Sequence, residues 1–144
     1  MGFFLKICRF FTLSMLLALA GPVSALEQLG EAYSRPLPPG QSTAVAYLEL
    51  RNDGDKPIRL ISVSSPLARS AEFHRHIHED GMMKMRKLSG IDLGLGKILR
   101  FQPGGYHIML FGVKRPLRVG DTFTMQIETD TGESLDVDVR VKAY

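Results

Sequence analysis

The segment AEFHRHIHEDGMMKMRKL, residues 71–88, decides the fold class of this chain. It contains two runs of strand length on either side of Asp80-Gly81, a dipeptide typical of the tight turn between two antiparallel strands. We therefore predict a β-hairpin with strands at 71–77 and 82–88. Its first half holds three of the four histidines of the chain, and its second half holds three of the seven methionines.

The strand pattern extends over most of the chain. From Ala44 onward, apolar residues recur with a period near two, and Gly, Pro, Asn or Asp interrupts them about every eight to twelve residues, which is typical of an antiparallel β-sandwich or barrel. No long stretch has a helical period. We expect strands at residues 44–51, 58–64, 71–77, 82–88, 97–102, 106–111, 122–129 and 134–141. The sequence thus predicts an all-β protein with a single domain.

Residues 1–25 have the features of an export signal. Lys6 and Arg9 precede an apolar run, and small residues at positions 23–25 offer a cleavage site. The run is shorter than the ~20 residues that a membrane-spanning helix requires, so we expect cleavage and no membrane insertion afterwards. The remaining chain is then expected to have an N-terminal lead-in segment at 26–43, irregular around its three prolines, and a β domain at 44–144.

The composition excludes several classes of function. The signal holds two of the 18 basic residues and none of the 15 acidic ones, which leaves a net charge of +1. The one short basic run, KRPLR at 114–118, is expected to be a solvated turn, so nothing indicates the clustered Lys and Arg that nucleic-acid binding requires. Cys8, the only cysteine, lies in the signal. After cleavage the chain can therefore form no disulfide, no thiol oxidoreductase centre and no cysteine-containing blue-copper site.

Imidazole and thioether groups gather in one part of the sequence. Because side chains alternate between the two faces of a strand, those on one face can be grouped strand by strand. The groups expected to project together, away from the core, are His74, His76 and His78; Met83 and Met85; and His107 and Met109. Imidazole alone suits several metals, whereas thioether sulfur favours Cu(I), so the mixed set points to copper.

Each of these residues also has a simpler explanation. His76 and His78 could be solvent-facing polar residues of a strand, or could assist the capture of Cu(II). Met82 and Met83 could be adaptable core filler, because methionine fits irregular apolar gaps. A metal site is favoured by the joint spacing of several residues rather than by any one of them.

Four residues have a spacing that resembles a known motif. His74, ten residues, Met85, twenty-one residues, His107, one residue and Met109 match the HX10MX21HXM copper-binding motif of the periplasmic PCuAC copper chaperones. The resemblance extends to AYLELRNDGD at 46–55, to DGMMKMR at 80–86 and to PGGYHIMLFGVKRPLRVGD at 103–121. It covers nearly the whole chain after the signal.

The resemblance implies a cupredoxin-like Greek-key β-barrel or sandwich with one Cu(I) near the surface, held by His74, Met85, His107 and Met109. Auxiliary ligands would come from His76, His78 and Met83, with Cu(II) as a secondary species. The implied protein is a monomeric periplasmic copper chaperone rather than an enzyme. Its acceptor would be subunit II of cytochrome c oxidase, a Sco-like protein, or both.

Three other functions compete with delivery. A copper-sequestering protein for tolerance would use the same ligands without a dedicated acceptor. A mononuclear copper enzyme is disfavoured because no Ser/His/Asp or paired-carboxylate arrangement stands out. A metal-free interaction domain would leave the spacing of the four residues to accident.

Overall fold

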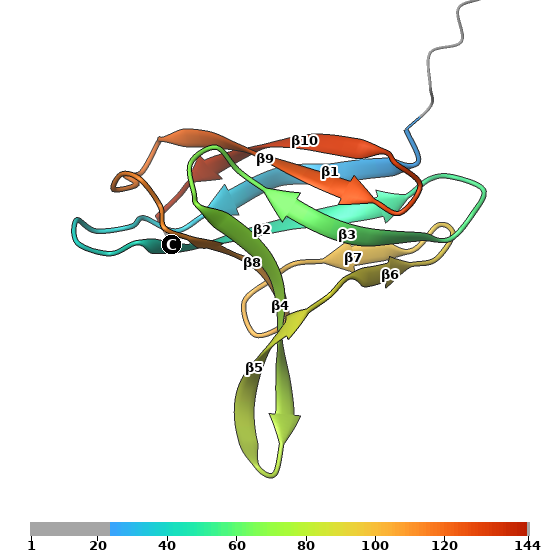
Figure 1. The fold of residues 1–144 in the computed structure, drawn as a ribbon, viewed down its shortest axis with the longest axis horizontal. Coiled ribbons are helices and arrows are strands. Elements are labelled where there is room, and N and C mark those ends of the chain that lie inside the picture. The colour runs from blue at the N-terminus through green and yellow to red at the C-terminus, as the bar shows by residue number, and fades with distance from the viewer. Residues whose placement is uncertain (1–23, 144) are drawn as a thin grey trace, which may run out of the picture.

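The computed structural model describes residues 24–143, so nearly all of the expected signal, residues 1–25, lies outside the described residues (Figure 1). The described chain consists of strands and connecting turns. The strands are β1 Leu26–Ser34, β2 Thr43–Asn52, β3 Ile58–Ser64, β4 Ser70–Glu79, β5 Met82–Leu88, β6 Ile91–Leu93, β7 Ile98–Arg100, β8 Tyr106–Phe111, β9 Thr122–Thr129 and β10 Ser134–Val141. Within residues 24–143 no helix is suited to crossing a membrane.

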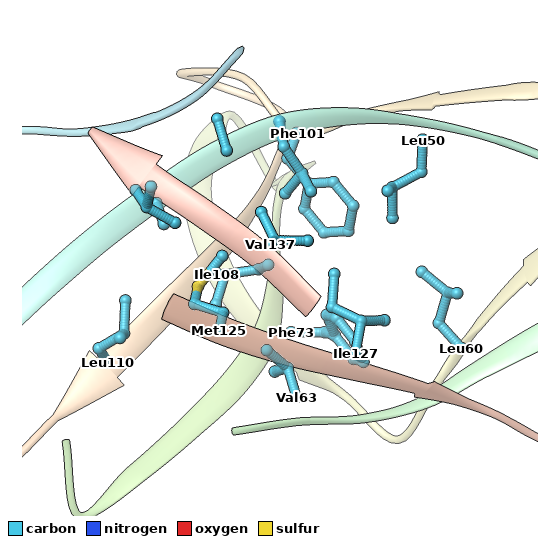
Figure 2. Packing of buried hydrophobic residues seen from close by; sticks show 14 of the residues in the cluster. Leu50, Leu60, Val63, Phe73, Phe101, Ile108, Leu110, Met125, Ile127 and Val137 are labelled. Carbon is cyan, nitrogen blue, oxygen red and sulfur yellow. The ribbon is translucent and has the colours of Figure 1, made fainter. Parts of the chain in front are cut away.

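All ten strands belong to one sheet. Their order is β5-β4-β8-β2-β1-β10-β9-β3-β6, and β7 pairs with β2. Strands from distant parts of this order share one core: Phe73 of β4 and Ile108 of β8 cluster with Met125 and Ile127 of β9 (Figure 2). The sheet therefore folds over on itself into a sandwich (Figure 1). The predicted all-β fold class is confirmed, although one strand pair, β1 with β10, is parallel.

The expected lead-in at 26–43 is wrong in its first half. Strand β1 lies inside the sheet between β2 and β10, and Ala32 is fully buried. The β domain consequently begins at Leu26 rather than Ala44. The pairing of β1 with β2 shifts register between Leu29 and Tyr33, next to Gly30 with φ +67°. Such a bulge interrupts the period of two, so the sequence pattern did not predict this strand. The short strand β6 was also not expected.

The β4–β5 hairpin extends beyond the sandwich (Figure 1). Strand β8 pairs with β4 only as far as Arg75, and β5, at the end of the sheet order, pairs with β4 alone. Asp80 and Gly81 have φ values of 54° and 73°, as the type I′ turn that joins two twisted strands requires. Because the outer hairpin contacts little else, Met82 and Met83 are 59% and 55% exposed. Their interpretation as core filler is therefore wrong.

Candidate metal centre

The core residues of β4 and β8 fix which side chains face outward. Phe73 and Ile108 are directly paired and point into the core, so the next residue pair, His74 with His107, projects from the opposite face. Met85 lies opposite His76, and Met109 lies opposite Glu72. Each of these methionines is thus a diagonal neighbour of His74, within the reach of a long side chain.

The four residues of the expected copper motif therefore lie on one face of three adjacent strands. Strand β4 supplies His74, β5 supplies Met85, and β8 supplies His107 and Met109. This arrangement brings residues up to 35 positions apart in the sequence to neighbouring places on the sheet.

The two imidazoles are more buried than the expected near-surface site would have them. His74 is 9% exposed and His107 is 3% exposed. The His76 ring stacks on His107 with 4.8 Å between centroids, and the Phe111 ring lies 6.1 Å from His74. These rings cover the outward face of the sheet, whereas Met85 is 48% exposed. The imidazoles of the site are thus buried, whereas the thioether of Met85 is open to solvent.

Each buried imidazole is anchored at one nitrogen and unpartnered at the other. His107 donates its Nδ1 proton to the Gly105 carbonyl at 3.1 Å, and His74 donates its Nε2 proton to Glu72 Oε2 at 2.9 Å. A neutral ring that donates from one nitrogen carries its lone pair on the other. Those atoms, His107 Nε2 and His74 Nδ1, are buried without a hydrogen-bond partner.

Such unpartnered buried nitrogens are uncommon, because buried polar atoms in folded proteins normally have partners. Metal-binding histidines typically show this pattern of one anchored and one free nitrogen. Burial lowers the pKa of His107; the Gly105 hydrogen bond opposes this, and neighbouring His76 and His74 reinforce it. The His107 ring is therefore neutral near pH 7, with its lone pair available to a ligand.

Glu72 and Lys87 are functional candidates that the sequence analysis missed. Lys87 Nζ donates to Glu72 Oε1 at 2.7 Å, while the other carboxylate oxygen holds His74. These two hydrogen bonds lower the pKa of Glu72 and keep the carboxylate ionised, and the bond from Lys87 makes the larger contribution. A usable signal existed, because Glu72 lies two residues before His74 and must share its face of the strand.

The auxiliary candidates divide into two groups. His76 lies against His107, and its Nδ1 is also buried without a partner. His78 lies at the hairpin tip, where its Nδ1 is 3.0 Å from the sulfur of Met83. Across residues 24–143, no three His, Cys, Asp or Glu side chains form a metal-binding group.

The sequence matches the family model described as "Putative lipoprotein LpqE-like" over residues 28–141. The chain belongs to the LpqE-like family. It is 29% identical over 106 residues to "Putative lipoprotein Lxx21020" of Leifsonia xyli subsp. xyli, a match covering 73% of this chain and 64% of that protein. It is 32% identical over 124 residues to "Uncharacterized protein RP573" of Rickettsia prowazekii, covering 83% and 68%.

This family assignment bears on export and on chain length. A family of lipoproteins is a family of exported proteins, which agrees with the expected export of this chain. The chain spans slightly less than two thirds of the Leifsonia relative.

Solved structures identify the fold of this LpqE-like protein as that of PCuAC domains. The apo PCuAC domain from PmoF1 has a TM-score of 0.69 at 22% identity, covering 86% of this chain and 98% of that one. The copper-bound PCuAC domain from PmoF2 has a TM-score of 0.68 at 24% identity, covering 86% and 97%. Cu(I)-bound DR1885 from Deinococcus radiodurans has a TM-score of 0.60 at 35% identity, covering 87% and 81%.

Proposed function

We propose that this LpqE-like protein is a periplasmic copper chaperone that binds one Cu(I) through His74, Met85, His107 and Met109. The observation that carries the proposal is the pair of buried imidazoles, each anchored at one nitrogen and unpartnered at the other. Support also comes from DR1885, which is Cu(I)-bound in its solution structure and 35% identical to this chain.

The chemistry of the ligand set favours Cu(I) over other metals. Two neutral imidazoles and two neutral thioethers suit a soft monovalent ion, whereas Zn(II) is usually bound by thiolates, imidazoles and carboxylates. Thioethers have no proton to lose, so acid competes with copper only at the imidazoles. A site without thiolate is also stable in an oxidising compartment, because no disulfide can form from it.

The open side of the site provides a route for release. Met85 is half-exposed and belongs to the protruding hairpin, whereas the imidazoles are buried in the sheet. An acceptor can therefore replace Met85 first and share the ion with the remaining ligands before taking it. The proposed acceptor is subunit II of cytochrome c oxidase or a Sco-like protein.

Single substitutions test the four ligands. We expect Met85→Leu and Met109→Leu each to weaken Cu(I) binding in an anaerobic competition titration against a Cu(I) chelator. Met125→Leu is the control, because Met125 is fully buried in the core and the change conserves volume. The proposal fails if all three variants bind Cu(I) as the parent does.

A gene deletion separates delivery from the alternative of sequestration, which would use the same ligands. Loss of a chaperone lowers oxidase activity when copper is limiting, and added copper restores it. Loss of a sequestering protein instead raises sensitivity to excess copper. We expect the first result; the second alone would contradict delivery.

A further inference from the structure

The hairpin carries a series of His–Met pairs on one face. In the β4–β5 register His78 lies opposite Met83 and His76 lies opposite Met85. Directly opposed residues of antiparallel strands project to the same side. The two pairs are two residues apart along the strands, a spacing of about 7 Å. They lead from the exposed tip toward His107, on which the His76 ring stacks.

The outer pair already brings two soft-metal donors together. His78 Nδ1 lies 3.0 Å from Met83 Sδ, and both side chains are exposed. Imidazole nitrogen and thioether sulfur are the same two donor types that make up the proposed copper site. The Met83 side chain needs to swing outward for an ion to enter between the two atoms, and its exposure leaves it free to do so.

Between the tip and Met85, the charged side chains of the hairpin strands lie on the other face. Lys84 and Arg86 both bind the carboxylate of Glu79, at 3.1 and 2.9 Å. By strand alternation these three residues project away from the His–Met pairs. The face with the pairs therefore offers neutral ligands to a cation without a lysine or arginine between the tip and Met85.

The inner pair connects the tip to the proposed site. His76 Nδ1 is buried without a hydrogen-bond partner, and its ring contacts His107. Met85, the residue opposite His76, is itself one of the four proposed ligands. An ion at the inner pair would thus already hold one ligand of the final site, and it could move inward by exchanging one ligand at a time.

We infer that His78 and Met83 form a second, weaker Cu(I) site at the hairpin tip, where the ion is first captured before it passes along His76 and Met85 to the four-ligand site. The inference rests on the proposed copper-binding function and adds to it a place of entry. Two ligands hold an ion less tightly than four, so transfer inward is favourable and the tip is vacated for the next ion.

Met83→Leu tests the inference, and Met82→Leu is its matched control. The two methionines are adjacent and similarly exposed, but Met82 lies opposite Glu79 on the other face. Cu(I) is supplied anaerobically as its bicinchoninate complex, and loading is followed by stopped flow. We expect Met83→Leu to load about tenfold more slowly, a barrier higher by about 1.4 kcal/mol, with unchanged final affinity. Met82→Leu should load like the parent.

Methionine methyl NMR gives a second readout on the parent protein. Once one equivalent of Cu(I) is bound, a second equivalent should shift the ε-methyl signal of Met83 and leave that of Met82 in place. Equal shifts at both, or at neither, would overturn the inference, as would parental loading by Met83→Leu. If the parent binds no Cu(I), the proposed function itself is wrong; if it binds one ion and Met83→Leu loads normally, only the entry site is refuted.

Discussion

His74 shows how one side chain is prepared for binding by its neighbours. Glu72 accepts a hydrogen bond from its Nε2–H, Lys87 holds Glu72, and the lone pair is left on the buried Nδ1. Neither partner is one of the four proposed ligands; both determine which nitrogen of His74 is available and how its ring is oriented. Partners of this kind typically contribute 10- to 100-fold to metal affinity.

We expect Glu72→Ala to weaken Cu(I) affinity by about 10- to 100-fold, because His74 loses the acceptor that fixes its tautomer. Glu72→Gln should retain more affinity, since its amide oxygen still accepts a hydrogen bond. Glu49→Gln is the control. Glu49 of β2 forms an ion pair with Arg100, away from the proposed ligands, so this substitution should leave Cu(I) affinity unchanged. Competition titration measures all three, and equal affinity in all three would rule out this role for Glu72.

The lowered pKa of His107 predicts an acid-sensitive fold. The unfolded chain takes up a proton at this histidine near its ordinary pKa of 6.5, whereas the folded protein resists protonation to lower pH. Stability is therefore complete above about pH 6.5 and falls as the pH drops below it. Urea unfolding of the apo protein between pH 7.5 and 5 should show this decline, with a shallower slope in His107→Gln. An identical slope in both proteins would count against the buried neutral ring.

At the scale of the element, the hairpin sets the register that brings Met85 opposite His76. Its strands and turn could be predicted from the sequence because alternation and the Asp80-Gly81 signal are local. The burial of His74 could not be predicted from the sequence, since it depends on Phe111, a residue of another strand. Strand β1 was not predicted for a different reason: the bulge at Gly30 interrupts the alternation of apolar and polar residues along it.

Gly81→Ala should strain the hairpin turn. The position has φ 73° and open space around an added Cβ, so the cost is backbone strain alone, roughly 1–2 kcal/mol. Gly132→Ala, at φ +83° and equally open, should cost a similar amount in the turn between β9 and β10. Only Gly81→Ala should weaken Cu(I) binding, since only this substitution displaces Met85, which the same hairpin carries. Urea unfolding and competition titration together check this; equal copper affinities in the two variants would contradict a role for the hairpin register.

At the scale of the whole molecule, one sheet provides both the core and the proposed site. The inner faces of β4 and β8 bury Phe73 and Ile108, and their outer faces present His74 and His107. The core pattern of β8 was predictable from its alternation. The order of the strands was not, because pairs such as β1 with β10 join segments far apart in the chain.

Two core substitutions separate stability from binding. Leu60→Ala in β3 and Ile108→Ala in β8 both empty a fully buried position and should each cost about 2–5 kcal/mol of unfolding free energy. Ile108 lies between His107 and Met109, so its loss should also weaken Cu(I) affinity, whereas Leu60→Ala should bind normally while folded. Denaturant unfolding and competition titration measure the two effects, and unchanged affinity in Ile108→Ala would argue that the outer face is independent of the core.

The most direct measurement of the central claim is X-ray absorption at the copper edge of the protein reconstituted with one Cu(I) under anaerobic conditions. The proposed site predicts two sulfur and two nitrogen scatterers in the first coordination shell, with one sulfur lost in Met109→Leu. A shell of nitrogen and oxygen alone would contradict it.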